Sequence, residues 1–129
     1  MPGLTEQSNQ DKSIDVYRKT WLKRIEARKH HLKEKKEMLL KLARNLADIL
    51  RNEYFVEEIY LIGSLTRPYL INEYTDIDIM VKGLVDADYF PALARLYKDL
   101  PAGIELDLIT METASPELLI LAKNERIVL

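Results

Sequence analysis

The stretch Ile62-Gly63-Ser64, followed after eleven residues by Asp76-Ile77-Asp78-Ile79, decides how this chain is interpreted. Apolar residues lead into the first stretch and alternate with aspartates in the second, which indicates two short strands. Successive side chains of a strand point to opposite faces, so Asp76 and Asp78 share one face. Like charges on one face destabilise a sheet. The pair therefore indicates either a site for a divalent cation, since Mg²⁺ prefers carboxylate oxygens, or a solvated face.

A third acidic strand is predicted over residues 104–109. In this strand Glu105 and Asp107 lie on one face, because successive side chains alternate. The opposite face carries Ile104, Leu106 and Leu108. If this strand lies beside residues 76–81, Asp107 converges on the two aspartates, and Glu105 flanks the site. Three carboxylates from two strands can hold two metal ions about 3.5–4 Å apart, which an in-line phosphoryl displacement requires.

The Gly-Ser pair that follows the first strand is a candidate phosphate-binding turn. Glycine permits close backbone approach, free amides at the start of a helix attract phosphate, and Ser64 adds a hydroxyl. Arg67 lies three residues further on and could reach a phosphate oxygen. Taken alone, a Gly-Ser pair is more often a plain turn, and a single arginine is more often a surface residue.

The rest of the chain alternates helices and strands. A helix is predicted over residues 86–100, a second begins at Ser115-Pro116, and a last strand covers residues 126–129. With the strand at residues 58–62, these elements predict an α/β (α+β) fold, a small mixed sheet of three to four strands backed by helices.

The N-terminal part of the chain has a different character. Residues 1–13 are predicted to be a loose tail and residues 14–51 a long helix, which either breaks near His30-His31 or has a first half outside the compact body. Residues 11–36 carry ten Lys and Arg against four acids, a charge of +6, whereas residues 37–129 carry nine against sixteen, a charge of −7. We therefore divide the chain into an N-terminal extension, residues 1–36, and a domain, residues 37–129. The basic helix could contact RNA, the acidic face of another protein, or solvent alone.

Composition excludes several classes of protein. The 129 residues contain no cysteine and only two histidines, which are adjacent, so disulfides, thiolate metal sites and a multi-histidine cage are excluded. No apolar run approaches the length of a membrane span, and the polar start does not resemble a secretory signal. These features predict a cytoplasmic protein that does not associate with membranes.

Together these motifs resemble the nucleotidyltransferase superfamily that includes DNA polymerase beta. Its signature is an apolar residue, Gly, Gly or Ser, a gap of nine to thirteen residues, and Asp, apolar, Asp or Glu, apolar, with a third acidic residue on a later strand. Residues 62–64, 76–79 and 107 match every position. Within the superfamily, residues 37–129 resemble a minimal nucleotidyltransferase (MNT) domain, the antitoxin of HEPN/MNT toxin–antitoxin pairs. The eleven-residue gap and the sequence Thr66-Arg67-Pro68 depart from the ten residues and Ala-Arg-Gly usual in that group.

The resemblance implies a role for each matching residue. Gly63 and Ser64 would hold the triphosphate of ATP, with Arg67 beside them. Asp76 and Asp78 would bind Mg²⁺, as two ions that Mn²⁺ could replace. Asp107 would complete the metal site and help to activate the attacking hydroxyl.

The implied reaction is transfer of AMP from ATP to a tyrosine of a HEPN-type toxin, which silences the toxin. The alternative is a catalytically silent module that neutralises or regulates its partner by contact alone. The intact aspartate set favours the enzyme, because without a metal such a cluster only costs stability. A small-molecule acceptor such as an aminoglycoside is disfavoured, since no second domain is present to hold it. The N-terminal helix could also mediate homo- or hetero-oligomerisation.

Overall fold

The computed structural model describes the backbone of residues 2–129 and the side chains of residues 12–67 and 69–129. The described chain divides into two compact units, one that ends at Glu34 and one that spans Lys35–Leu129. Its elements, in chain order, are α1 (Pro2–Tyr54), β1 (Glu58–Ile62), the 3-10 helices η1 (Gly63–Thr66) and η2 (Pro68–Leu70), β2 (Ile77–Lys82), the 3-10 helix η3 (Asp86–Asp88), α2 (Tyr89–Lys98), β3 (Leu106–Thr110), α3 (Pro116–Glu125) and β4 (Ile127–Val128). This mixed architecture confirms the predicted α/β class.

Helix α1 corrects one expectation and excludes a second. The backbone of residues 2–13, predicted to be a loose tail, is helical, with Pro2 at the first helical position, where its missing N–H costs no hydrogen bond. Met1 lies outside the described residues. The helix continues through His30 and His31 without the break that was one of the two alternatives, because no glycine or proline interrupts residues 14–51.

The four strands form one mixed sheet in the order β3-β2-β1-β4. Strand β2 is central: it pairs antiparallel with β1, which opposes Ile62 to Asp78, and parallel with β3, which opposes Asp78 to Asp107. The condition set for the convergence of the aspartates, that the strand of Asp107 lies beside the strand of Asp78, is therefore met. Both strands start later than predicted, at Ile77 and Leu106.

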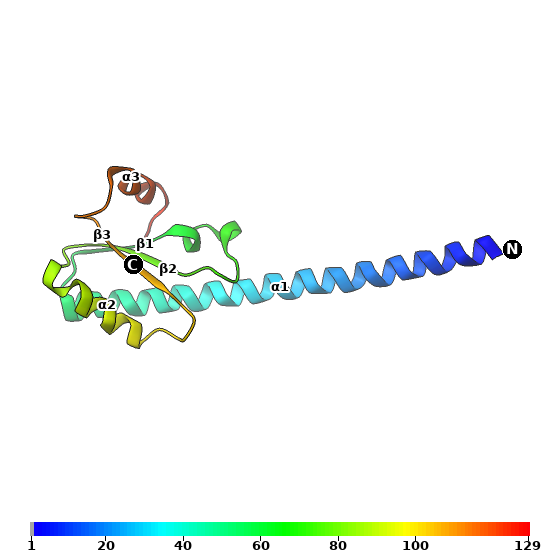
Figure 1. Ribbon diagram of the computed structural model, residues 1–129, viewed down its shortest axis with the longest axis horizontal. Coiled ribbons are helices and arrows are strands. Elements are labelled where there is room, and N and C mark those ends of the chain that lie inside the picture. Colours follow the sequence, from blue (N-terminus) through cyan, green and yellow to red (C-terminus); the bar gives the residue numbers. More distant parts are fainter. Residues whose placement is uncertain (1) are drawn as a thin grey trace. The chain divides into compact units, whose positions relative to one another are not determined.

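Each face of the sheet has its own helical cover. The main core joins the inward leucines and alanines of α1, from Leu39 onward, and the buried face of α2 to Ile77 and Ile79 of β2. The opposite face carries Tyr60, Ile62 and Met80, which pack against α3 around Ala122. Figure 1 shows α3 on one side of the sheet and α2 with the C-terminal half of α1 on the other. Asp78 and Asp107 alternate with core residues, so they lie on the α3 side.

Two tyrosines of α2 protect the exposed edge of β3. The hydroxyl of Tyr89 donates to the Leu108 carbonyl (2.6 Å). The hydroxyl of Tyr97 donates to the Leu106 carbonyl and accepts from the Leu106 N–H, both at 3.1 Å. An edge strand with unsatisfied backbone groups is prone to pair with other chains. Here the tyrosines occupy those groups, which fixes β3, and with it Asp107, against β2.

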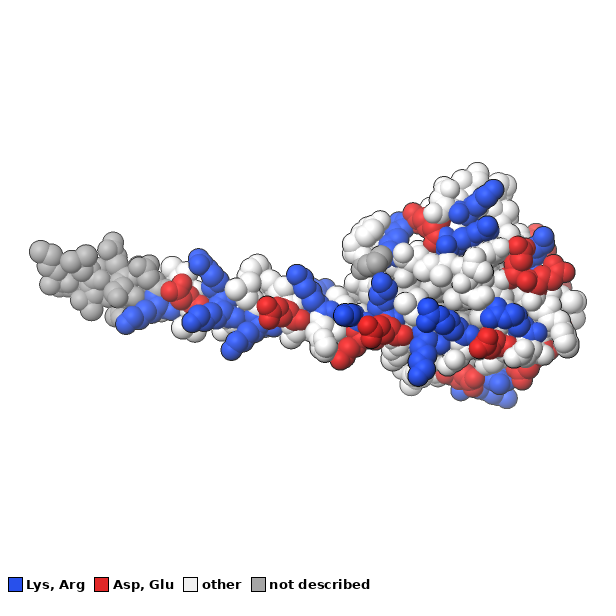
Figure 2. Space-filling model, turned by 180° about the vertical axis from the view of Figure 1, so that it is seen from behind, with Lys and Arg blue, Asp and Glu red and all other residues white. Residues whose placement is uncertain are grey.

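The first unit consists of the N-terminal part of α1, whose described side chains are mostly exposed. Ile14, Tyr17 and Trp21 are 54%, 75% and 63% exposed and line one stretch of the helix. Arg18 and Arg24 line the same stretch, and Figure 2 shows further lysines and arginines in blue along the described part of this segment. Among the described residues, no helix is both long enough and apolar enough to cross a membrane.

Candidate functional site

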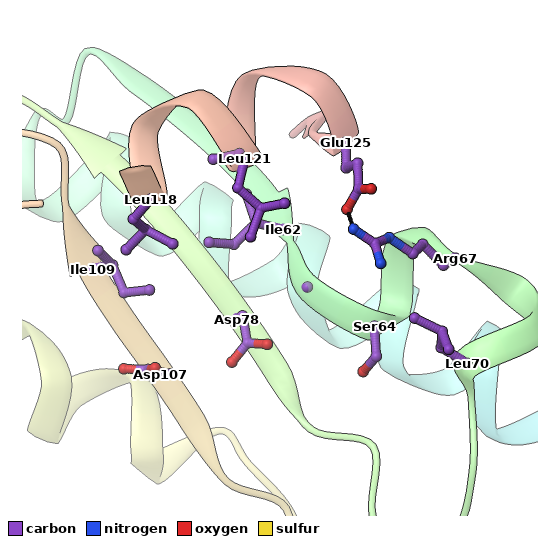
Figure 3. Close-up of a pocket in the computed structure, with 12 residues that line it drawn as sticks. Ile62, Ser64, Arg67, Leu70, Asp78, Asp107, Ile109, Leu118, Leu121 and Glu125 are labelled. Carbon is purple, nitrogen blue, oxygen red and sulfur yellow. Dashed lines mark ion pairs between the residues drawn. The ribbon is translucent and has the colours of Figure 1, made fainter. Parts of the chain in front are cut away.

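A pocket of about 330 Å³ opens between the sheet, η1 and α3. Five of the residues singled out in the sequence line it: Gly63, Ser64, Arg67, Asp78 and Asp107. They come from three separate segments, namely the turn after β1, the central strand and the edge strand. Figure 3 shows Asp78 between Ser64 on one side and Asp107 on the other. All of the predicted site residues except Asp76 therefore lie at one pocket.

Gly63 lies directly against Asp78. Its φ is +79°, in the left-handed region that favours glycine. A Cβ at this position would lie 2.2 Å from Asp78 Oδ2. The glycine thus lets the backbone turn away from β1 and lets the carboxylate come up against that turn. This close contact explains why a glycine and an aspartate far apart in the sequence belong to one motif.

The Asp78 carboxyl has a perturbed pKa. Its pKa is raised, chiefly by burial and then by the negative charges of Asp107 and Asp76. Opposed residues of neighbouring strands lie about 4.8 Å apart, so the charges of Asp78 and Asp107 repel one another across the ladder. This arrangement is unfavourable without a compensating cation, and perturbed carboxylates of this kind gather at functional sites.

Asp76 is close to this pair but is engaged elsewhere. It precedes β2, and its Oδ1 accepts a hydrogen bond from the Glu105 backbone N–H (3.3 Å). The loop before it is ordered: the Thr75 hydroxyl accepts from the Asn72 N–H (2.9 Å), and Lys35 Nζ donates to the Asn72 carbonyl (3.3 Å). Asp76 does not line the pocket. Within the described part of the chain, no group of three or more acidic, histidine or cysteine side chains is arranged to hold a metal ion.

Arg67 has a partner that the sequence did not reveal. Its guanidinium forms an ion pair with Glu125, the last residue of α3, and both side chains line the pocket. The Nε of Arg67 is buried and has no hydrogen-bond partner among the described residues. The ion pair crosses from the turn after β1 to the end of α3, and no spacing in the sequence could have indicated it. Glu125 therefore holds Arg67 at the mouth of the pocket.

An apolar wall closes the other side of the pocket. It consists of Ile62, Ile109 and two residues of α3, Leu118 and Leu121. Their apolar character was visible in the sequence, but an apolar residue of a short helix is more often part of a core, so they were not candidates. The site thus combines carboxylates, a polar turn and an arginine with an apolar surface, a composition typical of ligand sites.

Comparison with known proteins identifies the fold. No family model and no curated protein matches the sequence. Among solved structures, the chain is similar to a point mutant of the toxin–antitoxin MntA-HpeT, with 24% identity, a TM-score of 0.54, and coverage of 67% of this chain and 69% of that one. The chain is also similar to a toxin–antitoxin structure with AMP-PNP, with 22% identity, a TM-score of 0.53, and coverage of 65% of this chain and 69% of that one. A proposed nucleotidyltransferase from Sulfolobus solfataricus has 19% identity and a TM-score of 0.50, and the match covers 75% of this chain and 84% of that one. The chain has the nucleotidyltransferase fold.

This is the fold that the sequence motif indicated. The apolar-Gly-Ser turn follows β1, the Asp-apolar-Asp stretch enters β2, and the third aspartate is on the neighbouring β3. At these identities the likeness concerns the fold alone. The chemistry must be inferred from the site residues of this chain.

Proposed function

We propose that this protein is a Mg²⁺-dependent nucleotidyltransferase that transfers AMP from ATP to a tyrosine hydroxyl of a HEPN-type toxin and so acts as its antitoxin. The observation that carries the proposal is the Asp78–Asp107 pair, opposed across two strands and lying beside the Gly63-Ser64 turn in one pocket. Two of the similar structures, described as toxin–antitoxin proteins, one with an ATP analogue, support the choice of partner and nucleotide.

Three residues are suited to the phosphates of ATP. Gly63 has no side chain to obstruct the backbone, and Ser64 offers a hydroxyl at the same turn. Arg67 lines the same pocket, and its planar, positively charged guanidinium is suited to phosphate oxygens. Its ion pair with Glu125 fixes the guanidinium before the nucleotide binds.

The donor set fits Mg²⁺, a hard cation that takes carboxylate and phosphate oxygens. Asp78 and Asp107 would hold it, and Asp76 would supply a third carboxylate; in this structure Asp76 Oδ1 accepts from the Glu105 N–H. A bound ion would neutralise the charge on the phosphates and on the opposed aspartates. The pKa of Asp78 is raised chiefly by burial and then by the charges of Asp107 and Asp76, and a bound cation would offset those charges.

The reaction requires a base and a fixed leaving group. The tyrosine oxygen attacks the α-phosphorus of ATP, a new O–P bond forms, the bond from the α-phosphorus to the bridging oxygen breaks, and pyrophosphate leaves. The phenolic proton passes to the Asp107 carboxylate, which is exposed and on the open side of the pair, and then to water. Gly63, Ser64 and Arg67 retain the pyrophosphate as it departs.

The decisive test is the intact mass of a co-encoded HEPN-type protein after incubation with ATP and Mg²⁺. We expect a gain of one or more AMP units with the wild-type protein and none with Asp76→Asn, which weakens the charge of the site while retaining the side chain's shape. If the partner is neutralised without a change in mass, and equally well by Asp76→Asn, the protein is a binding module that acts by contact alone.

We further propose that the N-terminal helix contributes to the assembly with this partner. The segment 11–36 carries a charge of +6, so pairing of two such segments would bring like charges together, and an acidic partner surface is favoured instead. The exposed Ile14, Tyr17 and Trp21 supply apolar area for such a contact.

Removing residues 1–30 should leave a folded domain that binds its partner more weakly. The buried core begins at Leu39, so the deletion removes none of its members. The measurements are a thermal melt, in which a single cooperative transition is expected, and gel filtration with the HEPN-type partner. Loss of the transition would show that the helix belongs to the core. Unchanged affinity for the partner would exclude the proposed contact.

A further inference from the structure

A second hollow adjoins the candidate site at the C-terminal end of β3. We call it the β3-end groove; its volume is about 510 Å³, and it lies between the starts of α2 and α3. Tyr89 and Phe90 form its wall on the α2 side, and Thr113 and Ser115 its rim before α3. Ile109 and Leu118 line both the groove and the pocket of the aspartates, so the two hollows are neighbours on one surface.

The groove lies on the side of the aspartates away from the phosphate-binding turn. The sheet order β3-β2-β1 puts Asp107 on one side of Asp78 and the turn after β1 on the other. In Figure 3, Ser64 and Arg67 lie to one side of Asp78, whereas Asp107 and Ile109 lie to the other. Beyond Ile109, β3 leads directly to Thr110 and the groove.

The geometry of the transfer places the acceptor hydroxyl on the same side of the aspartates as the β3-end groove. In an in-line displacement the attacking and leaving oxygens lie on opposite sides of the phosphorus. If Gly63 and Ser64 hold the departing pyrophosphate, the attacking hydroxyl approaches from the β3 side, past Asp107. The β3-end groove lies along that approach, so the chain that bears the hydroxyl passes over it.

The surface chemistry of the groove suits a peptide. Phe90 is 75% exposed and packs edge-to-face on Tyr89, with 5.2 Å between the ring centroids. The Tyr89 ring is itself held by its hydrogen bond to the Leu108 carbonyl. An exposed aromatic ring that packs on a fixed, half-buried ring is typical of the anchor points of protein interfaces. Among the described residues that line the groove, Asp86 alone is charged, which is too little for a polycationic small molecule.

We propose that the β3-end groove binds the peptide segment of the partner protein that carries the acceptor tyrosine, with an apolar side chain of that segment packed on Phe90. The inference rests on the proposed function and adds the acceptor subsite to it. The tyrosine hydroxyl then reaches Asp107 from the groove, while the nucleotide occupies the pocket beside it.

The test compares two variants that each lose an exposed aromatic ring. Phe90→Ala removes the anchor; Tyr74→Ala is the matched control, 87% exposed and outside both hollows. We measure the rate of AMP transfer to the co-encoded HEPN-type protein by intact mass, and the affinity for AMP-PNP by calorimetry. Phe90→Ala should lower kcat/KM for the protein acceptor about tenfold or more, with unchanged AMP-PNP affinity. Tyr74→Ala should change neither, and Phe90→Leu should recover part of the loss.

The outcomes separate this inference from the proposed function. If the wild-type protein transfers no AMP, the proposed function fails. If the wild type transfers AMP and Phe90→Ala does so equally well, the groove does not bind the acceptor. If Phe90→Ala weakens AMP-PNP binding instead, the groove holds the nucleotide base, and the acceptor assignment is wrong. A melting temperature of Phe90→Ala equal to that of the wild type excludes unfolding as the cause of a lost rate.

Discussion

Asparagine in place of Asp78 should abolish AMP transfer and, in metal-free buffer, raise the thermal stability of the protein. The substitution keeps the shape of the side chain but removes a charge that is half-buried and opposed to Asp107. Relief of one directly opposed like-charge pair is worth about 0.2–1 kcal/mol. For a domain of this size that corresponds to a rise in the melting temperature of roughly 1–5 °C. A structural aspartate would give the opposite sign.

The pH dependence of the thermal stability provides an independent check on the charge of Asp78. The pKa of Asp78 is raised in the folded protein, so the folded state holds this proton to a higher pH than the unfolded state does. Its ionisation therefore lowers the stability as pH rises from the ordinary aspartate pKa through the raised one. The stabilisation by Asp78→Asn should be largest at a pH above the raised pKa of Asp78, should shrink as pH falls from the raised pKa to the ordinary aspartate value, and should be absent below that value.

Melting curves of both proteins in EDTA at neutral and acidic pH, with and without added Mg²⁺, measure these effects. Asp88→Asn, the same chemical change at a position outside the pocket, should not raise the melting temperature at neutral pH. Added Mg²⁺ should stabilise the wild type more than Asp78→Asn, because a ligand that binds only the folded state stabilises it by mass action. A marked loss of stability in Asp78→Asn would show that the carboxylate is structural, and the site would have to be assigned again.

Much of the site could be predicted from the sequence because it follows from local rules. The period of a strand places Ile77 and Ile79 in the core, where both are fully buried, and so turns Asp78 to the other face. Ser115-Pro116 predicted the start of α3, and the Ser115 hydroxyl indeed accepts from the Leu118 N–H (3.2 Å). These signals depend on residues a few positions apart, which a sequence displays directly.

What the sequence could not show depends on contacts between distant segments. The ion pair of Arg67 with Glu125 and the hydrogen bonds of Tyr89 and Tyr97 to β3 join elements with no fixed spacing. The bond from the Glu105 N–H to Asp76 likewise arises only once β2 and β3 are paired. It holds the Asp76 side chain at the beginning of the strand pair, so Asp76 does not line the pocket with Asp78 and Asp107, although all three were predicted to converge.

The close approach of Gly63 to Asp78 gives the second large effect. Alanine at position 63 must adopt a φ of +79°, which costs an L-residue about 1–2 kcal/mol. Its Cβ would also lie 2.2 Å from Asp78 Oδ2, so the carboxylate, the turn or both must shift. Overpacking of this kind costs about 1–3 kcal/mol. We expect Gly63→Ala to lose roughly 2–5 kcal/mol of unfolding free energy and nearly all transfer activity.

Gly103→Ala is the matched control for this effect. Gly103 has a similar φ of +88°, but a Cβ there would have no atom within 4 Å, so the substitution carries the backbone cost alone. Urea denaturation of both variants therefore isolates the contribution of the Asp78 contact. In the double variant Gly63→Ala/Asp78→Ala the clashing carboxylate is absent, and the free energy of unfolding should return to near that of Gly103→Ala, while transfer stays lost. If Gly63→Ala is no less stable than Gly103→Ala and retains transfer, the turn tolerates a side chain, and the close fit of Gly63 against Asp78 is not what builds the site.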